Sequence, residues 1–193
     1  MQFENVIRRR KMVRAYTSDP VLQGAVERIV AAGLAAPSAG NAQGTRLAVV
    51  TSDSLRRRIA DAAGEPDWIA KGYRPWLGTA PVLIGLGVRI GDYGDRYDSR
   101  DKAASTPVRA WDVPYWWFDA GAACEAMLLA TVNEGLAAGF LGSHNIPGLA
   151  LLLEWSDVDP AGVITIGHAA DSPPVGSAIS EPARQGRVSW HRE

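Results

Sequence analysis

Cationic side chains gather near the start of the chain, where positions 8–14 have the sequence Arg-Arg-Arg-Lys-Met-Val-Arg. Guanidinium groups suit bidentate contacts with phosphate oxygens, so Arg10, Lys11 and Arg14 are candidates for a phosphate clamp. The alternative is the solvated basic end of a helix. Because 20 Lys and Arg against 21 Asp and Glu leave a net charge of −1, a single small phosphate fits better than a nucleic acid or an anionic membrane surface.

A second unusual segment is 36–43, with the sequence Ala-Pro-Ser-Ala-Gly-Asn-Ala-Gln. Its small residues would let a ligand approach the backbone, while Ser38, Asn41 and Gln43 offer hydrogen-bond donors and acceptors. An ordinary turn between a helix and a strand is the alternative. Taken together, the two segments indicate a phosphorylated cofactor that carries a polar heterocycle.

Other chemistry finds no support in the sequence. The single cysteine, Cys124, excludes an intramolecular disulfide framework and a cysteine-based metal cluster. The three histidines lack zinc-ligand spacing, and no GxSxG nucleophile motif is present. The glycines in 85–91 lie in a strand-like run and have the wrong spacing for a dinucleotide loop. The acidic residues in 92–101 do not follow the calcium-loop pattern, so a solvated loop is expected there.

Hydrophobic residues make up 47% of the 193 positions, which is enough to build one domain over 1–193. Without a leader pattern or a membrane-length apolar run, we expect a cytoplasmic protein. The irregular spacing of the strands favours an α+β sheet covered by helices. Helices are predicted near 2–10, 21–36, 55–63, from 115 or 118 to 134, and near 149–155, and strands near 47–50, 81–88, 138–142 and 163–167.

Local signals add detail to these elements. Asp19 is expected to cap, and Pro20 to open, the helix that begins at 21. Asp53 or Ser54 is expected to cap the third helix, and Gly135 to end the long one. Between 91 and 114 the periodicity disappears, which predicts a functional loop, a lid or a disordered insert.

Aromatic residues follow this insert at Trp111, Tyr115, Trp116 and Trp117. They can stack on a flat acceptor or a nicotinamide, or they can pack at a dimer interface. The sequence leaves both alternatives open. The tail, 171–193, is rich in Pro, Ser and Gly and is expected to be extended.

Several motifs, in order, resemble the nitroreductase-like FMN-dependent oxidoreductase family. Positions 7–16 are similar to its opening motif and 36–43 to its second motif, while 119–130 resembles its central helix. Gly135-Leu136, 163–168 and Arg184 complete the order. The resemblance implies an α+β homodimer with a central mixed or antiparallel sheet, a long central helix at the dimer interface, and two FMN sites built from both chains.

By matching motifs, the resemblance also implies which residues surround the cofactor. Asn41 would face the flavin, with Ser38 and Gln43 close by. A backbone N–H of Ser143 or His144 would reach N5 and stabilise the charge that develops on reduction. The full set is Arg10, Lys11, Met12, Arg14, Ser38, Asn41, Gln43, Leu141, Gly142, Ser143, His144, Arg184 and Arg187.

This chain departs from the family pattern at three places. Met12 stands where a serine is usual, and Gly44-Thr45 stands where proline and an aromatic residue are usual. The closing segment is shorter, so that Arg187 shares or takes the role of Arg184 at the phosphate.

The function that the resemblance implies is hydride transfer from NADH or NADPH to FMN, and from FMN to a small acceptor such as a quinone, nitroaromatic or enone. No metal is implied. The alternatives are a flavin-binding or storage protein without turnover, a specialised flavin oxidase or dehydrogenase, and a relative that binds the deazaflavin F420. The sequence does not distinguish NADH from NADPH.

Overall fold

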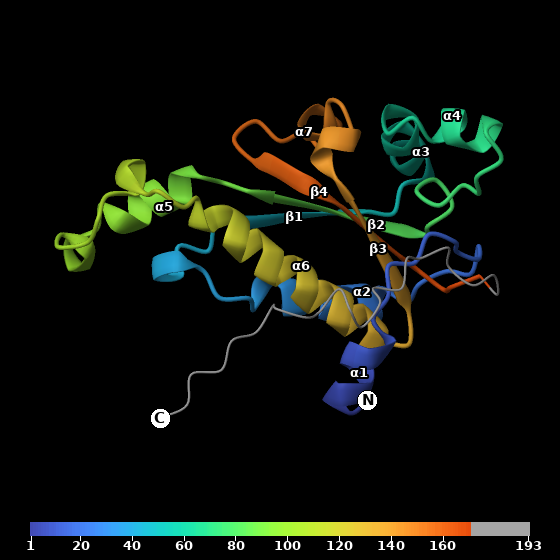
Figure 1. Cartoon of the computed structure of the whole chain (residues 1–193), viewed down its shortest axis with the longest axis horizontal. Helices are drawn as coiled ribbons and strands as arrows, with labels where there is room; N and C mark the ends of the chain where they lie inside the picture. The colour runs from blue at the N-terminus through green and yellow to red at the C-terminus, as the bar shows by residue number, and fades with distance from the viewer. Residues whose placement is uncertain (171–193) are drawn as a thin grey trace, which may run out of the picture.

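The computed structural model of the chain describes residues 1–170 (Figure 1). Four strands form one antiparallel sheet in the order β1-β2-β4-β3, which confirms the predicted α+β class. The strands are β1 (Thr45–Val50), β2 (Val82–Val88), β3 (Ala137–Gly142) and β4 (Asp159–Gly167). Strand β3 is therefore a terminal strand of the sheet.

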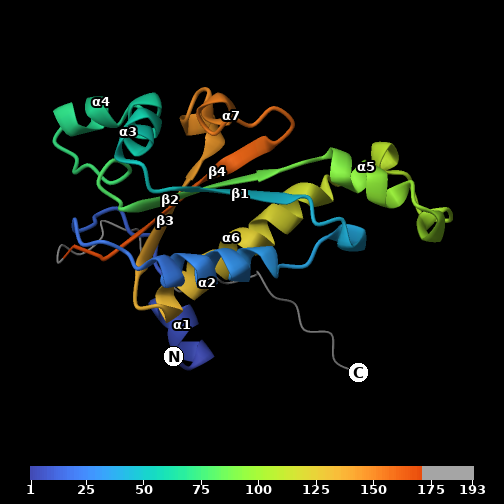
Figure 2. The same cartoon turned by 180° about the vertical axis from the view of Figure 1, so that it is seen from behind.

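Helices cover both faces of this sheet (Figures 1 and 2). Helices α2 and α6 lie on one face, and α3, α4 and α7 lie on the other. The helices are α1 (Phe3–Arg9), α2 (Gln23–Leu34), α3 (Asp53–Ala62), α4 (Glu65–Ala70), α5 (Gly91–Tyr97), α6 (Tyr115–Asn133) and α7 (Leu149–Leu152). Short 3-10 turns are η1 (Ala39–Asn41), η2 (Arg100–Lys102), η3 (Val108–Ala110) and η4 (Ser143–Asn145). None of these helices is both long and apolar enough to cross a membrane.

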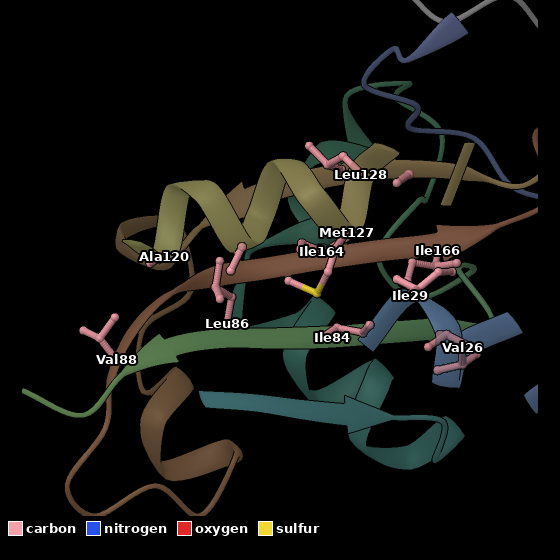
Figure 3. Close-up of a cluster of buried hydrophobic side chains, with 13 residues drawn as sticks. Val26, Ile29, Ile84, Leu86, Val88, Ala120, Met127, Leu128, Ile164 and Ile166 are labelled. Atoms are coloured by element: carbon pink, nitrogen blue, oxygen red, sulfur yellow. The ribbon is translucent and has the colours of Figure 1, made fainter. Parts of the chain in front are cut away.

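Strand β2 separates two cores because successive side chains point to opposite faces. Ile84 and Leu86 pack with Met127 of α6 and with α2 on one face (Figure 3). Leu83 packs with α3 and α7 on the other face. The two glycines of β2 leave room for neighbouring side chains. At Gly85, for example, a Cβ would lie only 2.5 Å from the Leu153 side chain.

Several predicted boundaries are wrong for local reasons. Helix α2 begins at Gln23, because Asp19 instead accepts a hydrogen bond from the Thr17 hydroxyl at 2.8 Å. The cap of α3 is Ser52, whose hydroxyl accepts the backbone N–H of Leu55. Helix α7 ends at Leu152, and the six-residue α4 has no predicted counterpart. The end of α6 is as predicted, since Gly135 adopts a left-handed φ of 76° just after it.

The segment 91–114 is ordered rather than a disordered insert, and a role as a functional loop or lid stays a prediction. This segment contains α5, η2 and η3, and it is anchored by the fully buried Tyr93. Trp111 packs edge-on against Tyr97 and Tyr115, with ring centroids 4.8 and 5.5 Å apart. Single aromatic anchors leave no periodic pattern, and each turn is too short to show a helical one.

Candidate functional site

The segment 10–14, here called the cationic segment, runs beside β3. Met12 forms a parallel bridge with Ala138, and the N–H of Val13 donates to the Ala138 carbonyl at 2.8 Å. The crossing is close, since a Cβ at Gly139 would lie 2.4 Å from the Val13 carbonyl oxygen. This backbone contact fixes where the cationic side chains leave the main chain.

A small buried network secures the crossing. The Tyr16 hydroxyl donates to the Val13 carbonyl at 2.7 Å, so the hydroxyl of Thr165 donates to Tyr16 at 2.6 Å. The Thr165 oxygen in turn accepts the Gly139 N–H at 3.1 Å. Burial is the main cause that raises the pKa of Tyr16 well above its usual range, which keeps the phenol a neutral donor.

The cations of this segment are largely available to a ligand. Arg10 pairs with Glu125 of α6 at 3.2 Å. Within residues 1–170, neither Lys11 nor Arg14 has a carboxylate at ion-pair distance. Arg14 instead lies over the ring of Trp76, with its Cζ 5.4 Å from the ring centroid. Three cations with at most one carboxylate between them are a donor set that suits a phosphate.

The structure brings Arg14 together with the predicted residue Leu141. Both line a cleft of about 300 Å³, together with Asn145 of η4. The opposite wall consists of Trp68, Tyr73 and Trp76, which the sequence prediction missed. The sequence offers one signal for these three residues. They form a dense group of aromatic side chains in a segment that lacks the alternating pattern of a strand.

Beyond Ala138, the outer edge of β3 has no partner strand among the described residues. Because backbone groups alternate between the two edges of a strand, Phe140 and Gly142 present theirs to the same edge as Ala138. Ser143 and His144 continue from there into η4. The side chain of His144 contacts that of Asn145, with Nε2 2.8 Å from Nδ2. Donation by the N–H of Ser143 or His144 to a flavin stays a prediction.

Met12 and Cys124 lie in a different hollow, of about 310 Å³, on the α6 side. Burial raises the pKa of the Cys124 thiol to about 11, with a further contribution from nearby Glu125. The thiol is therefore neutral at ordinary pH. The polar groups that share this hollow with Met12 and Cys124 include Glu125 and Trp117.

Residues 38–43, here called the left-handed turn, have an unusual backbone. Gly40, Asn41 and Gln43 have φ values of 61°, 60° and 53°. Side-chain-bearing residues rarely adopt such angles, which must be imposed by surrounding contacts. One contact is internal, because the Ser38 hydroxyl accepts the Gln43 N–H at 2.8 Å.

Three further contacts come from elsewhere in the chain. Asp119, which is only 5% exposed, accepts the Ala39 N–H at 2.8 Å. Arg96 of α5 donates to the Gly40 carbonyl at 2.6 Å, and Arg46 of β1 donates to the Gln43 carbonyl at 3.0 Å. The insert predicted to be a loop is therefore a support for this turn. The sequence prediction missed Asp119 and Arg96 because each acts on a distant segment, whereas Arg46 lies only three positions from Gln43.

An aromatic pocket of about 690 Å³ adjoins the turn. Its lining includes Pro37, Ser38, Ala39, Tyr97, Thr106, Trp111, Tyr115, Phe118 and Asp119. Trp111 and Tyr115 thus face the pocket, whereas Trp116 packs against the core beneath α6 and Trp117 lines the hollow around Met12. The Trp-rich segment has more than one role.

The cationic segment and the left-handed turn do not meet within one chain. The turn lies beside α5 at one end of the molecule, and the cationic segment lies near β3 and α1 at the other end (Figures 1 and 2). The predicted cofactor residues therefore form two separate groups in one chain. Arg184 and Arg187 lie outside the described residues.

Comparison with known proteins identifies the family of this chain. Residues 7–168 match the sequence profile of the nitroreductase family. This chain belongs to the nitroreductase family. Among relatives, the FMN reductase (NAD(P)H) of Bacillus subtilis (strain 168) is 29% identical over 170 residues, which are 83% of this chain and 63% of the reductase. The chain thus spans less than two thirds of that relative's length.

Solved structures show the same nitroreductase fold. A Desulfovibrio desulfuricans protein in complex with FMN has a TM-score of 0.74 at 22% identity, covering 99% of both chains. The NADPH:FMN oxidoreductase of Vibrio harveyi, complexed with NAD⁺, has a TM-score of 0.72 at 18% identity and covers 99% of this chain and 79% of its own. At these identities, the likeness concerns the fold alone.

Proposed function

We propose that this chain is an FMN-dependent oxidoreductase that passes hydride from NADH or NADPH through the flavin to a small acceptor. The observation that carries the proposal is the cleft that joins Arg14 to Leu141 at the open edge of β3. A cation for a phosphate and free backbone groups for a ring are adjacent there. The names of the Bacillus subtilis and Vibrio harveyi relatives support FMN with a nicotinamide nucleotide.

The residues present fit FMN by the chemistry of their donors. Arg10, Lys11 and Arg14 would hold the phosphate, with Arg184 or Arg187 added from the tail. The backbone N–H of Ser143 or His144 would donate to the ring. Bound FMN supplies reversible hydride transfer at N5, and a donor placed there favours the anionic reduced ring.

We place the left-handed turn at the same cofactor, but from the other chain of a homodimer. Within one chain the turn and the cationic segment lie at opposite ends of the molecule. A symmetric dimer can bring the turn of one protomer to the cationic segment of its partner, and this builds two equal sites. Asn41 and Gln43 would then hydrogen-bond to the polar edge of the ring.

The pocket beside the turn suits the acceptor. Four aromatic side chains line it, those of Tyr97, Trp111, Tyr115 and Phe118. Among the described lining residues the one acidic group, Asp119, is already engaged by the Ala39 N–H and the Tyr93 hydroxyl. An uncharged planar acceptor such as a quinone, nitroaromatic or enone can stack on Trp111 and Tyr115, at about 0.5–1.5 kcal/mol per aromatic contact beyond burial.

An absorbance spectrum of the purified protein tests the proposal. We expect a yellow protein whose chromophore is FMN by mass, and whose flavin bands bleach when NADH or NADPH is added without oxygen. Bound FMN that neither nucleotide bleaches would favour a storage protein or a specialised oxidase instead. A chromophore with the mass of F420 would replace the cofactor, and a protein that takes up no flavin would contradict the proposal.

A further inference from the structure

One buried carboxylate holds the backbone of the segment that connects α3 to β2. Glu65, at the start of α4, is 6% exposed. Its carboxylate accepts the backbone N–H groups of Trp76 and Leu77, both at 2.7 Å, and of Gly78 at 3.0 Å. Three donors to one buried carboxylate hold this stretch of backbone in a single position.

The fixed backbone determines where the indole of Trp76 lies. The ring packs over β3, because a Cβ added at Gly139 would be 3.1 Å from its Cζ3 atom. Arg14 lies over the same ring, with its Cζ 5.4 Å from the ring centroid. Trp76 thus contacts both β3 and one cation of the cationic segment.

This contact matters because no carboxylate of residues 1–170 lies at ion-pair distance from Arg14. A free arginine side chain loses rotamer entropy when it is ordered, so its orientation is costly to fix at the moment of binding. A carboxylate partner would occupy the guanidinium N–H groups. An aromatic ring attracts the cation through its π face and leaves those N–H groups open to a phosphate.

We propose that Trp76 is a positioning residue that holds Arg14 toward the cofactor phosphate, and that Glu65 in turn holds Trp76. The inference rests on the proposed function and deepens it, since it assigns the preference for a phosphorylated over an unphosphorylated flavin to the segment 65–78. Trp76 also lines the cleft of the proposed site, and its effect on the phosphate passes through Arg14.

The test measures dissociation constants of FMN and riboflavin, which lacks the phosphate, by flavin fluorescence with wild type and Trp76→Leu. Loss of a cation–π contact should weaken FMN binding about 3- to 10-fold. Riboflavin binding should change less than about twofold, because Arg14 has no phosphate to meet. Trp76→Phe keeps an aromatic face and should restore part of the preference.

A double-mutant cycle shows whether the effect passes through Arg14. In an Arg14→Met background, Trp76→Leu should have no further effect on FMN binding. Glu65→Gln replaces one acceptor with a donor, and it should reproduce the selective loss of FMN binding. The control Trp155→Leu removes a tryptophan that packs under β2, remote from the cationic segment, and should leave the ratio of the two constants unchanged.

The outcomes separate the inference from the proposed function. If wild type prefers FMN and Trp76→Leu keeps that preference, the inference alone is overturned. The same holds if both flavins lose affinity equally, or if the loss persists without Arg14. A wild-type protein that binds neither flavin overturns the proposed function, and the inference with it.

Discussion

The cationic segment and the left-handed turn both serve the proposed cofactor, yet different parts of each are held in place. In the cationic segment the backbone is fixed to β3 and by Tyr16, whereas the side chains of Lys11 and Arg14 have no carboxylate of residues 1–170 at ion-pair distance. In the turn the backbone itself is held, at the Ala39 N–H and at the carbonyls of Gly40 and Gln43.

This difference follows from what each region recognises. A phosphate attracts cations over several ångströms and tolerates some freedom in long side chains. The edge of a planar ring is read by short hydrogen bonds, which require donors and acceptors already in position. The turn therefore holds a strained backbone under several ties, and the cationic segment needs only an anchored main chain.

The largest expected effect comes from Gly40→Ala, which attacks the turn. An alanine at this position would have to keep the left-handed φ of 61°. Its Cβ would lie 2.7 Å from the Tyr97 ring. Strain and overpacking together should lower the free energy of unfolding by about 2–4 kcal/mol, as measured in urea. The matched control is Gly135→Ala, where φ is 76° but nothing lies within 4 Å, so the loss should be only about 1 kcal/mol. If both variants lost the same free energy of unfolding, this result would contradict a close packing of the insert against the turn.

Arg10→Ala attacks the other region and should weaken FMN binding by about 1.5–3 kcal/mol, the size of a charge-assisted contact. Arg14→Ala tests the same clamp independently. Neither variant should change the turn, so stability in urea should remain close to that of wild type. Arg9→Ala removes the same charge from the exposed end of α1 and serves as the control. FMN affinity that survives both Arg10→Ala and Arg14→Ala would remove the phosphate clamp.

The smallest expected effect is on the pH dependence of stability. It concerns the two buried tyrosines that anchor the two regions. Burial raises the pKa of both Tyr16 and Tyr93 above the usual value of 10, and the hydrogen bond to Asp119 adds to the effect at Tyr93. For both tyrosines the pKa in the folded state is higher than in the unfolded state. The stability that the protonated phenol contributes is therefore fully present below about pH 10 and is lost as pH rises above 10. Each tyrosine should lower the free energy of unfolding by about 1.4 kcal/mol at pH 11.

Tyr93→Phe and Tyr16→Phe should each remove one share of this alkaline loss. Urea unfolding between pH 8 and 11 measures the difference. If the curve of Tyr93→Phe stays parallel to that of wild type, Tyr93 does not remain a neutral donor to Asp119.

The sequence predicts the parts of this protein that repeat or that carry charge. Continuous apolar runs identify the buried strands and α6, and the residue types alone identify Arg10 and Arg14. The supports are different. Asp119 acts on Ala39 over 80 positions, Arg96 acts on Gly40 over 56, and Glu65 acts on Trp76 over 11.

No local pattern encodes such pairs, because each partner is ordinary in its own segment. Arg96 and Asp119 look like any polar residue of a helix until the fold brings the turn to them. The sequence of 91–114 suggests a functional loop, a lid or a disordered insert for the same reason. Its order comes from Tyr93 and Trp111, which make tertiary contacts rather than a periodic face.

The central claim is that one cofactor site combines the cationic segment of one protomer with the left-handed turn of its partner. Two variants test it: a clamp variant with Arg10→Glu and Arg14→Glu, and a turn variant with Asn41→Asp and Gln43→Glu. Each should be purified without flavin as a homodimer, because every site then has one defective half. The two chains are next co-expressed with different affinity tags, and the mixed dimer is isolated through both tags.

In the mixed dimer, one site unites both intact halves and the other unites both defective ones. The flavin content of this dimer should therefore return to about half a flavin per chain, and reduction by NADH or NADPH should return with it. A mixed dimer that stays free of flavin would mean that each site is built within a single chain, and would contradict the account.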